Sequence, residues 1–276
     1  MASSALVNVV DGAELCLVRL LADSAEPGSI PTNFIPDCEE CIAHSDASRL
    51  LKTIVAEKGA IGALVSLDGE AVSAISLLAA CLDRVEGASS ELMLNELADS
   101  IISISSSDAD VNSTSKAITL LATLYNMRSD PTEKIKLLVK MIQLAVSSDG
   151  SSTLLEADNS VLRKLIDPKQ LVTMLDEWNI EPVGRRELYR AAAEGSLKSK
   201  VTQQHFTLLV VETYSQSDLD VSGLESAKQA AMGAIRDPIS LFVEQRKILS
   251  LPAVQALEKS NGKLFFPSYC LVRAWY

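Results

Sequence analysis

Apolar residues recur at helical spacing along almost the whole chain. Between Ala71 and Val85, positions 71, 75, 78, 79, 82 and 85 are apolar, which is the i, i+3, i+4, i+7 pattern of one helix face. The same spacing occurs over residues 171–178, 206–214 and 224–235. No convincing pair of segments shows the period-two alternation of half-buried strands. The pattern predicts an all-α protein of about a dozen helices, each of roughly 10–18 residues.

Three Asp-Pro pairs mark expected helix starts, at Asp130-Pro131, Asp167-Pro168 and Asp237-Pro238. An aspartate in this position caps free N–H groups, and proline is tolerated at the first helical position. The helix expected over residues 131–146 is apolar on most of its circumference, so it should have neighbours on several sides. Sequential helices joined by short loops are antiparallel, and a long series of them forms a compact bundle or a degenerate helical-repeat (α-solenoid-like) array.

Composition supports a globular helical protein. Of 276 residues, 47% are apolar and only 4% aromatic, which argues against both a disordered chain and a β-sandwich. The segment Ser103–Ser115 is rich in Ser, Asp and Asn and suggests a boundary between two halves. We therefore expect an N-terminal helical segment (1–110), a helical-repeat region (111–264) and a divergent tail (265–276). The tail holds five of the twelve aromatic residues (Phe265, Phe266, Tyr269, Trp275 and Tyr276).

The charge pattern bears on partners and location. A formal charge of −11 argues against unaided nucleic-acid binding, which needs a basic face. Lys134, Lys136 and Lys140 are expected to form the solvated side of one helix.

The start of the chain is a poor secretory signal, and no apolar stretch is long enough to cross a bilayer. Five cysteines without framework spacing suit a reducing compartment, so the cytosol is the expected location.

The best candidate for chemistry is the group Cys38, Cys41 and His44. Two thiols and an imidazole at this spacing could supply three zinc ligands, and the two thiols alone could form a redox dithiol. No fourth ligand with paired spacing follows, and no thioredoxin-like strand context surrounds the cysteines. We therefore interpret these residues as buried or partly exposed cysteines of a helix. The alternative, which belongs to a different functional class, is a small zinc or thiol enzyme.

Other catalytic patterns are weak. His44 and His205 are the only histidines, and no serine lies in a G-x-S-x-G elbow. The segment 59–62 lacks the length and the lysine of a phosphate-binding loop. The adjacent acids Glu39-Glu40 and Asp176-Glu177 should point to different sides of their helices. The sequence therefore predicts no catalytic, cofactor-binding or metal-binding residues, and a protein that is not an enzyme.

An ordered set of segments carries a resemblance to a known family. These segments are Ala117–Asn126, Leu175–Ile180, Arg186–Tyr189, Ala227–Ile235 with the following Arg-Asp-Pro, and Ile248–Glu258. In this order and spacing they resemble the subunit M family of eukaryotic translation initiation factor 3, whose members are PCI-domain proteins. The resemblance covers roughly residues 115–264, and the Leu-Pro-Ala-Val run within the last segment is similar to plant members in particular.

The resemblance implies a helical-repeat array leading into a PCI domain, and a non-catalytic cytoplasmic scaffold. The implied partners are other initiation-factor subunits and, through the complex, the 40S ribosomal subunit, with no direct nucleic-acid contact and no membrane. The implied process is recruitment of mRNA and initiator tRNA. PCI subunits of the COP9 signalosome or the proteasome lid are the alternative with the same fold.

The chain departs from the family at its end. The tail from Phe265 stands where a winged helix should follow, which suggests a truncated or alternatively spliced product or a gene-model error. Because PCI subunits associate largely through that module, assembly competence is in question. We also expect the tail to be poorly ordered or exposed, because it places five aromatics where the fold should continue.

Overall fold

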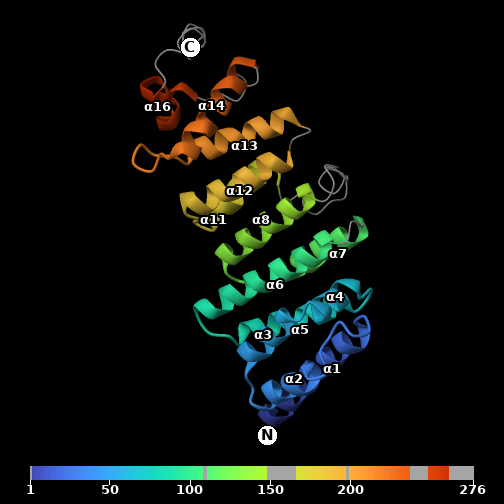
Figure 1. Ribbon diagram of the computed structural model, residues 1–276. Helices are drawn as coiled ribbons and strands as arrows, with labels where there is room; N and C mark the ends of the chain where they lie inside the picture. The colour runs from blue at the N-terminus through green and yellow to red at the C-terminus, as the bar shows by residue number, and fades with distance from the viewer. Residues whose placement is uncertain (1, 108–110, 148–165, 197–198, 237–247, 261–276) are drawn as a thin grey trace. The chain divides into compact units, whose positions relative to one another are not determined.

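The computed structural model describes residues 2–107, 111–147, 166–196, 199–236 and 248–260. Within these ranges the chain forms thirteen α-helices and one short 3-10 helix, and no strand is present (Figure 1). The all-α prediction is therefore confirmed for this part of the chain. The chain divides into two compact units, Met1–Gly150 and Ser151–Tyr276, which are described separately.

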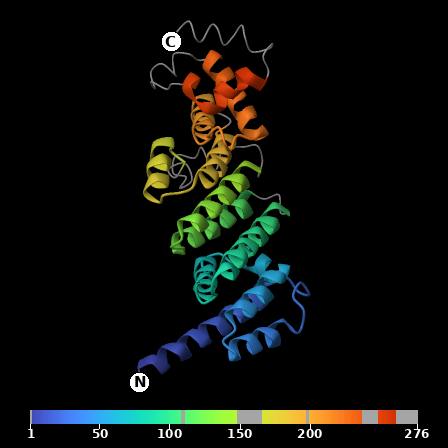
Figure 2. The same cartoon turned by 90° about the vertical axis from the view of Figure 1, so that its left-hand side faces the viewer.

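Alternate helices of the N-terminal unit contact each other, which produces two layers. One layer contains α4, α6 and α8, and the other contains α3, α5 and α7, while sequential helices such as α7 and α8 also pack together (Figures 1 and 2). The helices are α1 (Ala2–Ser24), α2 (Phe34–Ala43), α3 (Ala47–Ala56), α4 (Lys58–Ser66), α5 (Ala71–Asp83), α6 (Ala88–Ser107), α7 (Val111–Met127) and α8 (Pro131–Ser147). Because α8 touches α6 in its own layer and α7 in the other layer, its buried face is wide.

Ion pairs between neighbouring helices of the same layer show the relative direction of these helices. Lys136 and Lys140 of α8 pair with Glu91 and Asp99 of α6, so residue numbers rise in the same direction and the two helices are parallel. The same holds for α5 and α7. Lys116, early in α7, lies 2.8 Å from Asp68 just before α5. At the other end of the pair, Arg128 follows α7 and contacts the last residue of α5. Successive helical hairpins thus repeat the same orientation.

A buried carboxylate joins α1 to α5. Glu14 is only 3% exposed, and its Oε1 atom accepts hydrogen bonds from Arg84 and from the thiol of Cys81, whose Sγ lies 3.4 Å away. Burial and the neighbouring Glu14 raise the pKa of Cys81 to about 12, so this thiol stays protonated. These two hydrogen bonds offset the cost of burying the Glu14 carboxylate.

The C-terminal unit packs its helices mainly as sequential neighbours, α12 on α13, α13 on α14 and α14 on α16. Its elements are α11 (Pro168–Glu177), α12 (Pro182–Gly195), α13 (Lys200–Glu212), α14 (Val221–Arg236), the 3-10 helix η1 (Ile248–Ser250) and α16 (Pro252–Ser260). Small residues allow close packing of α14 on α13, because Ala227, Ala230 and Ala234 are buried and a Cβ at Gly233 would lie 3.0 Å from Gln204.

Local capping explains where these helices begin and end. The Asp167 carboxylate accepts hydrogen bonds from the N–H groups of Lys169 and Gln170, and Asp130 accepts one from Thr132. Both Asp-Pro starts are therefore confirmed, whereas Asp237-Pro238 lies outside the described residues. At the end of α11, Asn179 adopts φ +50° and the N–H of Ile180 reaches the carbonyl of Leu175, as in a Schellman cap.

The structure bears on the expected polar segment and on the lysines of α8. The segment Ser103–Ser115 is mostly helical, because α6 and α7 occupy it and pack on each other. The two compact units divide after Gly150. The boundary that the sequence suggests near residue 110 stays a prediction. The lysines of α8 are half-buried beside other side chains rather than facing free solvent: two lie against the carboxylates of α6, and Lys134 lies over the Tyr125 ring.

The aromatic tail from Phe265 lies outside the described residues. Among the helices that are described, none combines the length and the apolar character needed to span a bilayer.

Candidate interaction site

The structure buries both thiols of the candidate metal or redox group. Cys38 and Cys41 of α2 are fully buried, whereas His44 follows the helix and is exposed. Burial raises the pKa of Cys38 to about 12, with further contributions from Cys41 and Asp37, and burial also raises the pKa of Cys41. Both shifts favour the thiol, whereas metal binding and redox exchange need the thiolate. Across the described ranges, no cluster of three or more His, Cys, Asp or Glu is placed to hold a metal ion.

The adjacent acids diverge, as the helical periodicity predicts. Glu39 pairs with Arg19 at 3.3 Å, whereas Glu40 pairs with Arg49 at 3.0 Å. Asp176 pairs with Arg185, and Glu177 lines a separate, shallow depression on α11. Neither pair converges on a common point.

The other residues considered for chemistry lie in ordinary helices. His205 lies on α13 beside Phe206, with ring centroids 6.5 Å apart. The segment 59–62 forms the first half of α4 rather than a phosphate-binding loop.

A cleft lies in the C-terminal unit, beside the turn between α11 and α12. Its volume is about 540 Å³, which lies in the range of small-molecule sites. The turn between α11 and α12 and one side of α13 form its walls: Val172, Asp176, Asn179, Ile180, Glu181, Pro182, Arg185, Tyr189, Leu209, Glu212 and Thr213. Two of the segments that carry the family resemblance, 175–180 and 186–189, contribute to these walls.

Arg185 shapes the cleft by closing the end of α11. Its Nε donates to the carbonyl of Ile180 at 2.7 Å, one Nη donates to the carbonyl of Leu175 at 3.1 Å, and the other pairs with Asp176. A cation at a helix C-terminus satisfies free carbonyls and complements the helix dipole. Because its guanidinium is occupied in this way, Arg185 has a structural role in the cleft wall.

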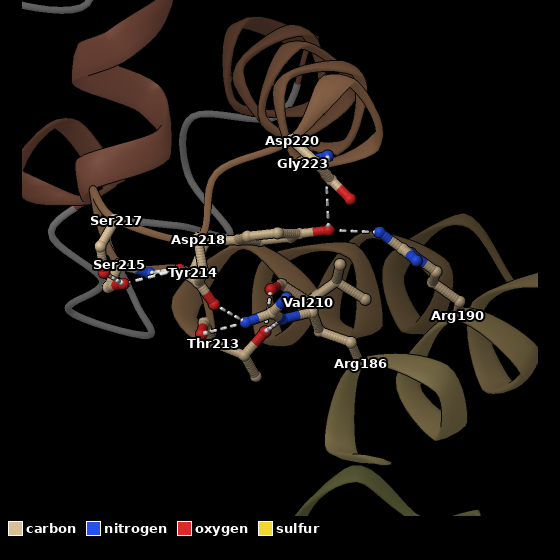
Figure 3. A network of polar contacts seen from close by, with 10 residues as sticks. All are labelled: Arg186, Arg190, Val210, Thr213, Tyr214, Ser215, Ser217, Asp218, Asp220 and Gly223. Carbon is tan, nitrogen blue, oxygen red and sulfur yellow. Dashed lines mark hydrogen bonds and ion pairs between the residues drawn. The ribbon is translucent and has the colours of Figure 1, made fainter. Parts of the chain in front are cut away.

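Beside the cleft, a set of polar side chains joins α12, α13 and the start of α14 (Figure 3). We call this set the α12–α14 network; its members are Arg186, Arg190, Thr213, Tyr214, Ser215, Asp218, Asp220 and Gly223. Arg186 lies over the Tyr214 ring, 4.0 Å from its centroid. Its Nε donates to the Thr213 hydroxyl at 3.1 Å, and an Nη group pairs with Asp218. The network therefore fixes the loop 213–220 against α12.

The second half of the network depends on the Tyr214 hydroxyl. Arg190 donates to this hydroxyl, which donates in turn to Asp220 at 3.2 Å, while Asp220 caps α14 by accepting from the Gly223 N–H at 2.6 Å. The Nε of Arg190 is buried and has no acceptor among the described residues. Gly223 is required by space, because a Cβ there would lie 2.8 Å from the Tyr214 ring.

Both aspartates of the network are held as carboxylates. Hydrogen bonds from Ser215, followed by those from Arg186, lower the pKa of Asp218, and the Gly223 N–H, with help from Tyr214, lowers the pKa of Asp220. Because the folded-state pKa is lowered, each group stabilises the fold above its unfolded pKa of about 3.9. That stabilisation is lost as the pH falls through the lowered folded value.

Replacing Tyr214 with phenylalanine is expected to lower the free energy of unfolding by about 1–2 kcal/mol, because the ring remains but two hydrogen bonds are lost. Denaturant unfolding followed by circular dichroism measures the change. Ser226→Ala is a matched control on α14, since its hydroxyl bonds only to its own helix at the Ser222 carbonyl. A Tyr214→Phe chain as stable as the Ser226→Ala chain would show that the network contributes little.

Sequence reasoning did not identify the α12–α14 network. Its only local signals are two arginines four residues apart on α12 and two aspartates two residues apart before α14. Neither comparison with models of known protein families nor a search of curated proteins finds a match to this chain. The cleft and the network are therefore defined by their geometry alone.

Proposed function

We propose that this chain is a non-catalytic scaffold subunit of eukaryotic translation initiation factor 3, similar to subunit M, and that it acts in the cytoplasm. The observation that carries the proposal is the ordered set of family-like segments along a chain of sequential helical hairpins. On this reading the two-layer N-terminal unit is part of a PCI-type helical array. Its partners would be other subunits of the factor and, through them, the 40S ribosomal subunit.

Three features of the described residues support a scaffold. The cores are built from apolar helix faces, and most of the polar groups discussed above pair within the chain. Several large apolar side chains remain on the surface, including Leu92 (63% exposed), Val183 (69%) and Val221 (84%). On this proposal, these side chains and the cleft are among the surfaces that would contact other proteins.

Affinity capture tests the proposal. A tagged chain is incubated with a eukaryotic cell extract, and the bound proteins are identified by mass spectrometry, with the tag alone as control. We expect initiation-factor 3 subunits and 40S proteins above the control. Recovery of COP9 signalosome or proteasome-lid subunits instead would support the alternative PCI assembly, and recovery of none of these would refute the scaffold proposal.

A further inference from the structure

Ser217 lies in the loop between α13 and α14, which contains several members of the α12–α14 network. The loop covers residues 213–220, is not helical, and exposes the Ser217 side chain. Carboxylates follow at the next position and at the third position, Asp218 and Asp220. A second serine with this spacing, Ser107, is followed by acids that lie outside the described residues.

We propose that Ser217 is a phosphorylation site for an acidophilic serine/threonine kinase, and that its phosphorylation opens the α12–α14 network. Such kinases bind their substrates through a basic groove, so acids directly after the target serine supply the complementary charge. They also act on segments outside helices, and the loop 213–220 lies between the end of α13 and the start of α14. This inference does not depend on the proposed role in translation.

The chemical step is an ordinary phosphoryl transfer from Mg-ATP, which the kinase supplies together with its catalytic carboxylate. The Ser217 Oγ attacks the γ-phosphorus, and a new O–P bond forms. The bond between that phosphorus and the oxygen bridging to the β-phosphate breaks, and ADP leaves. The hydroxyl proton passes to the carboxylate of the kinase.

The surroundings of Ser217 explain the expected structural effect. Its Oγ lies 2.9 Å from the Ser215 Oγ, which donates to Asp218 at 2.6 Å, and Asp218 in turn pairs with Arg186. In the unmodified loop, two arginines balance two aspartates. A phosphate adds about two negative charges beside Asp218. The phosphate removes the Ser215–Ser217 hydrogen bond and competes with Asp218 for Arg186, so the loop and the first turn of α14 should open.

The first test is site-resolved phosphorylation of the full chain. The purified protein is incubated with an acidophilic serine/threonine kinase and Mg-ATP, and modified residues are located by mass spectrometry. We expect phosphate on Ser217 and a loss of at least about ten-fold in the phosphate carried by the loop 213–220 in Ser217→Ala. Ser222→Ala is the matched control, because Ser222 has Glu225 three positions on but lies inside α14. Absence of phosphate from Ser217 would overturn the proposal, whether or not Ser107, Ser215 or Ser222 is phosphorylated.

The second test measures opening. Amide hydrogen exchange is compared between the phosphorylated and unmodified chains, in a Ser107→Ala background so that only the C-terminal site differs. We expect exchange to become about three- to ten-fold faster across residues 214–224 and to stay unchanged in α2. Unchanged or slower exchange across residues 214–224 in the phosphorylated chain would contradict the proposed opening.

Discussion

Replacing Arg128 with methionine is expected to lower the free energy of unfolding by about 3–5 kcal/mol, because it leaves a buried carboxylate without its partner. The Arg128 side chain is 9% exposed and that of Glu133 is 8% exposed, and their Nε and Oε2 atoms lie 2.7 Å apart. A second nitrogen of Arg128 lies 2.6 Å from Asp83 at the end of α5. The arginine therefore joins three helices at one point.

Denaturant unfolding followed by circular dichroism measures this loss, with the slope of the transition compared between variants. Arg49→Met is the matched control, since Arg49 also pairs with a glutamate but both side chains are about half exposed. We expect little change in the control. The double variant Arg128→Met/Glu133→Leu should recover most of the loss, because an apolar pair replaces the buried charges. If Arg128→Met proves as stable as Arg49→Met, this account is contradicted.

Two glycines of the same helix are expected to respond to alanine in opposite directions. A Cβ at Gly59 would lie 2.5 Å from the carbonyl oxygen of Ser29, a backbone atom that cannot move aside cheaply. We expect Gly59→Ala to lower the free energy of unfolding by about 1–3 kcal/mol, the usual cost of overpacking. A Cβ at Gly62 would meet nothing within 4 Å, so Gly62→Ala should raise stability by up to about 1 kcal/mol.

Thermal and denaturant unfolding of the two single variants tests this contrast directly, since both replace a glycine of α4 with alanine. Equal stabilisation by the two alanines would show that the loop containing Ser29 yields to the new methyl group. In that case the contact between this loop and α4 would contribute little to packing.

Helix positions and helix ends could be predicted from the sequence because their causes are local. The apolar spacing over residues 131–146 and the cap at Asp130 locate α8 almost to the residue. The cap at Asp167 does the same for α11. The divergence of Glu39 and Glu40 follows from the helical period alone.

The partners of charged residues could not be predicted in this way. Lys136 and Glu91 are 45 residues apart in the sequence, as are Arg128 and Asp83. Their pairing depends on how two successive hairpins align, which a single helix does not specify. The polar composition of Ser103–Ser115 likewise does not reveal that α6 and α7 pack together.

The sequence by itself determined that the described residues form amphipathic helices, and where several of them start, because side-chain periodicity and capping act within a few residues. Only the tertiary structure decided which thiols are buried, which of two glycines lacks space for a methyl group, and that Tyr214 joins Arg190 to Asp220. These properties depend on distances between segments remote in sequence, and those distances are set by the packing of whole helices.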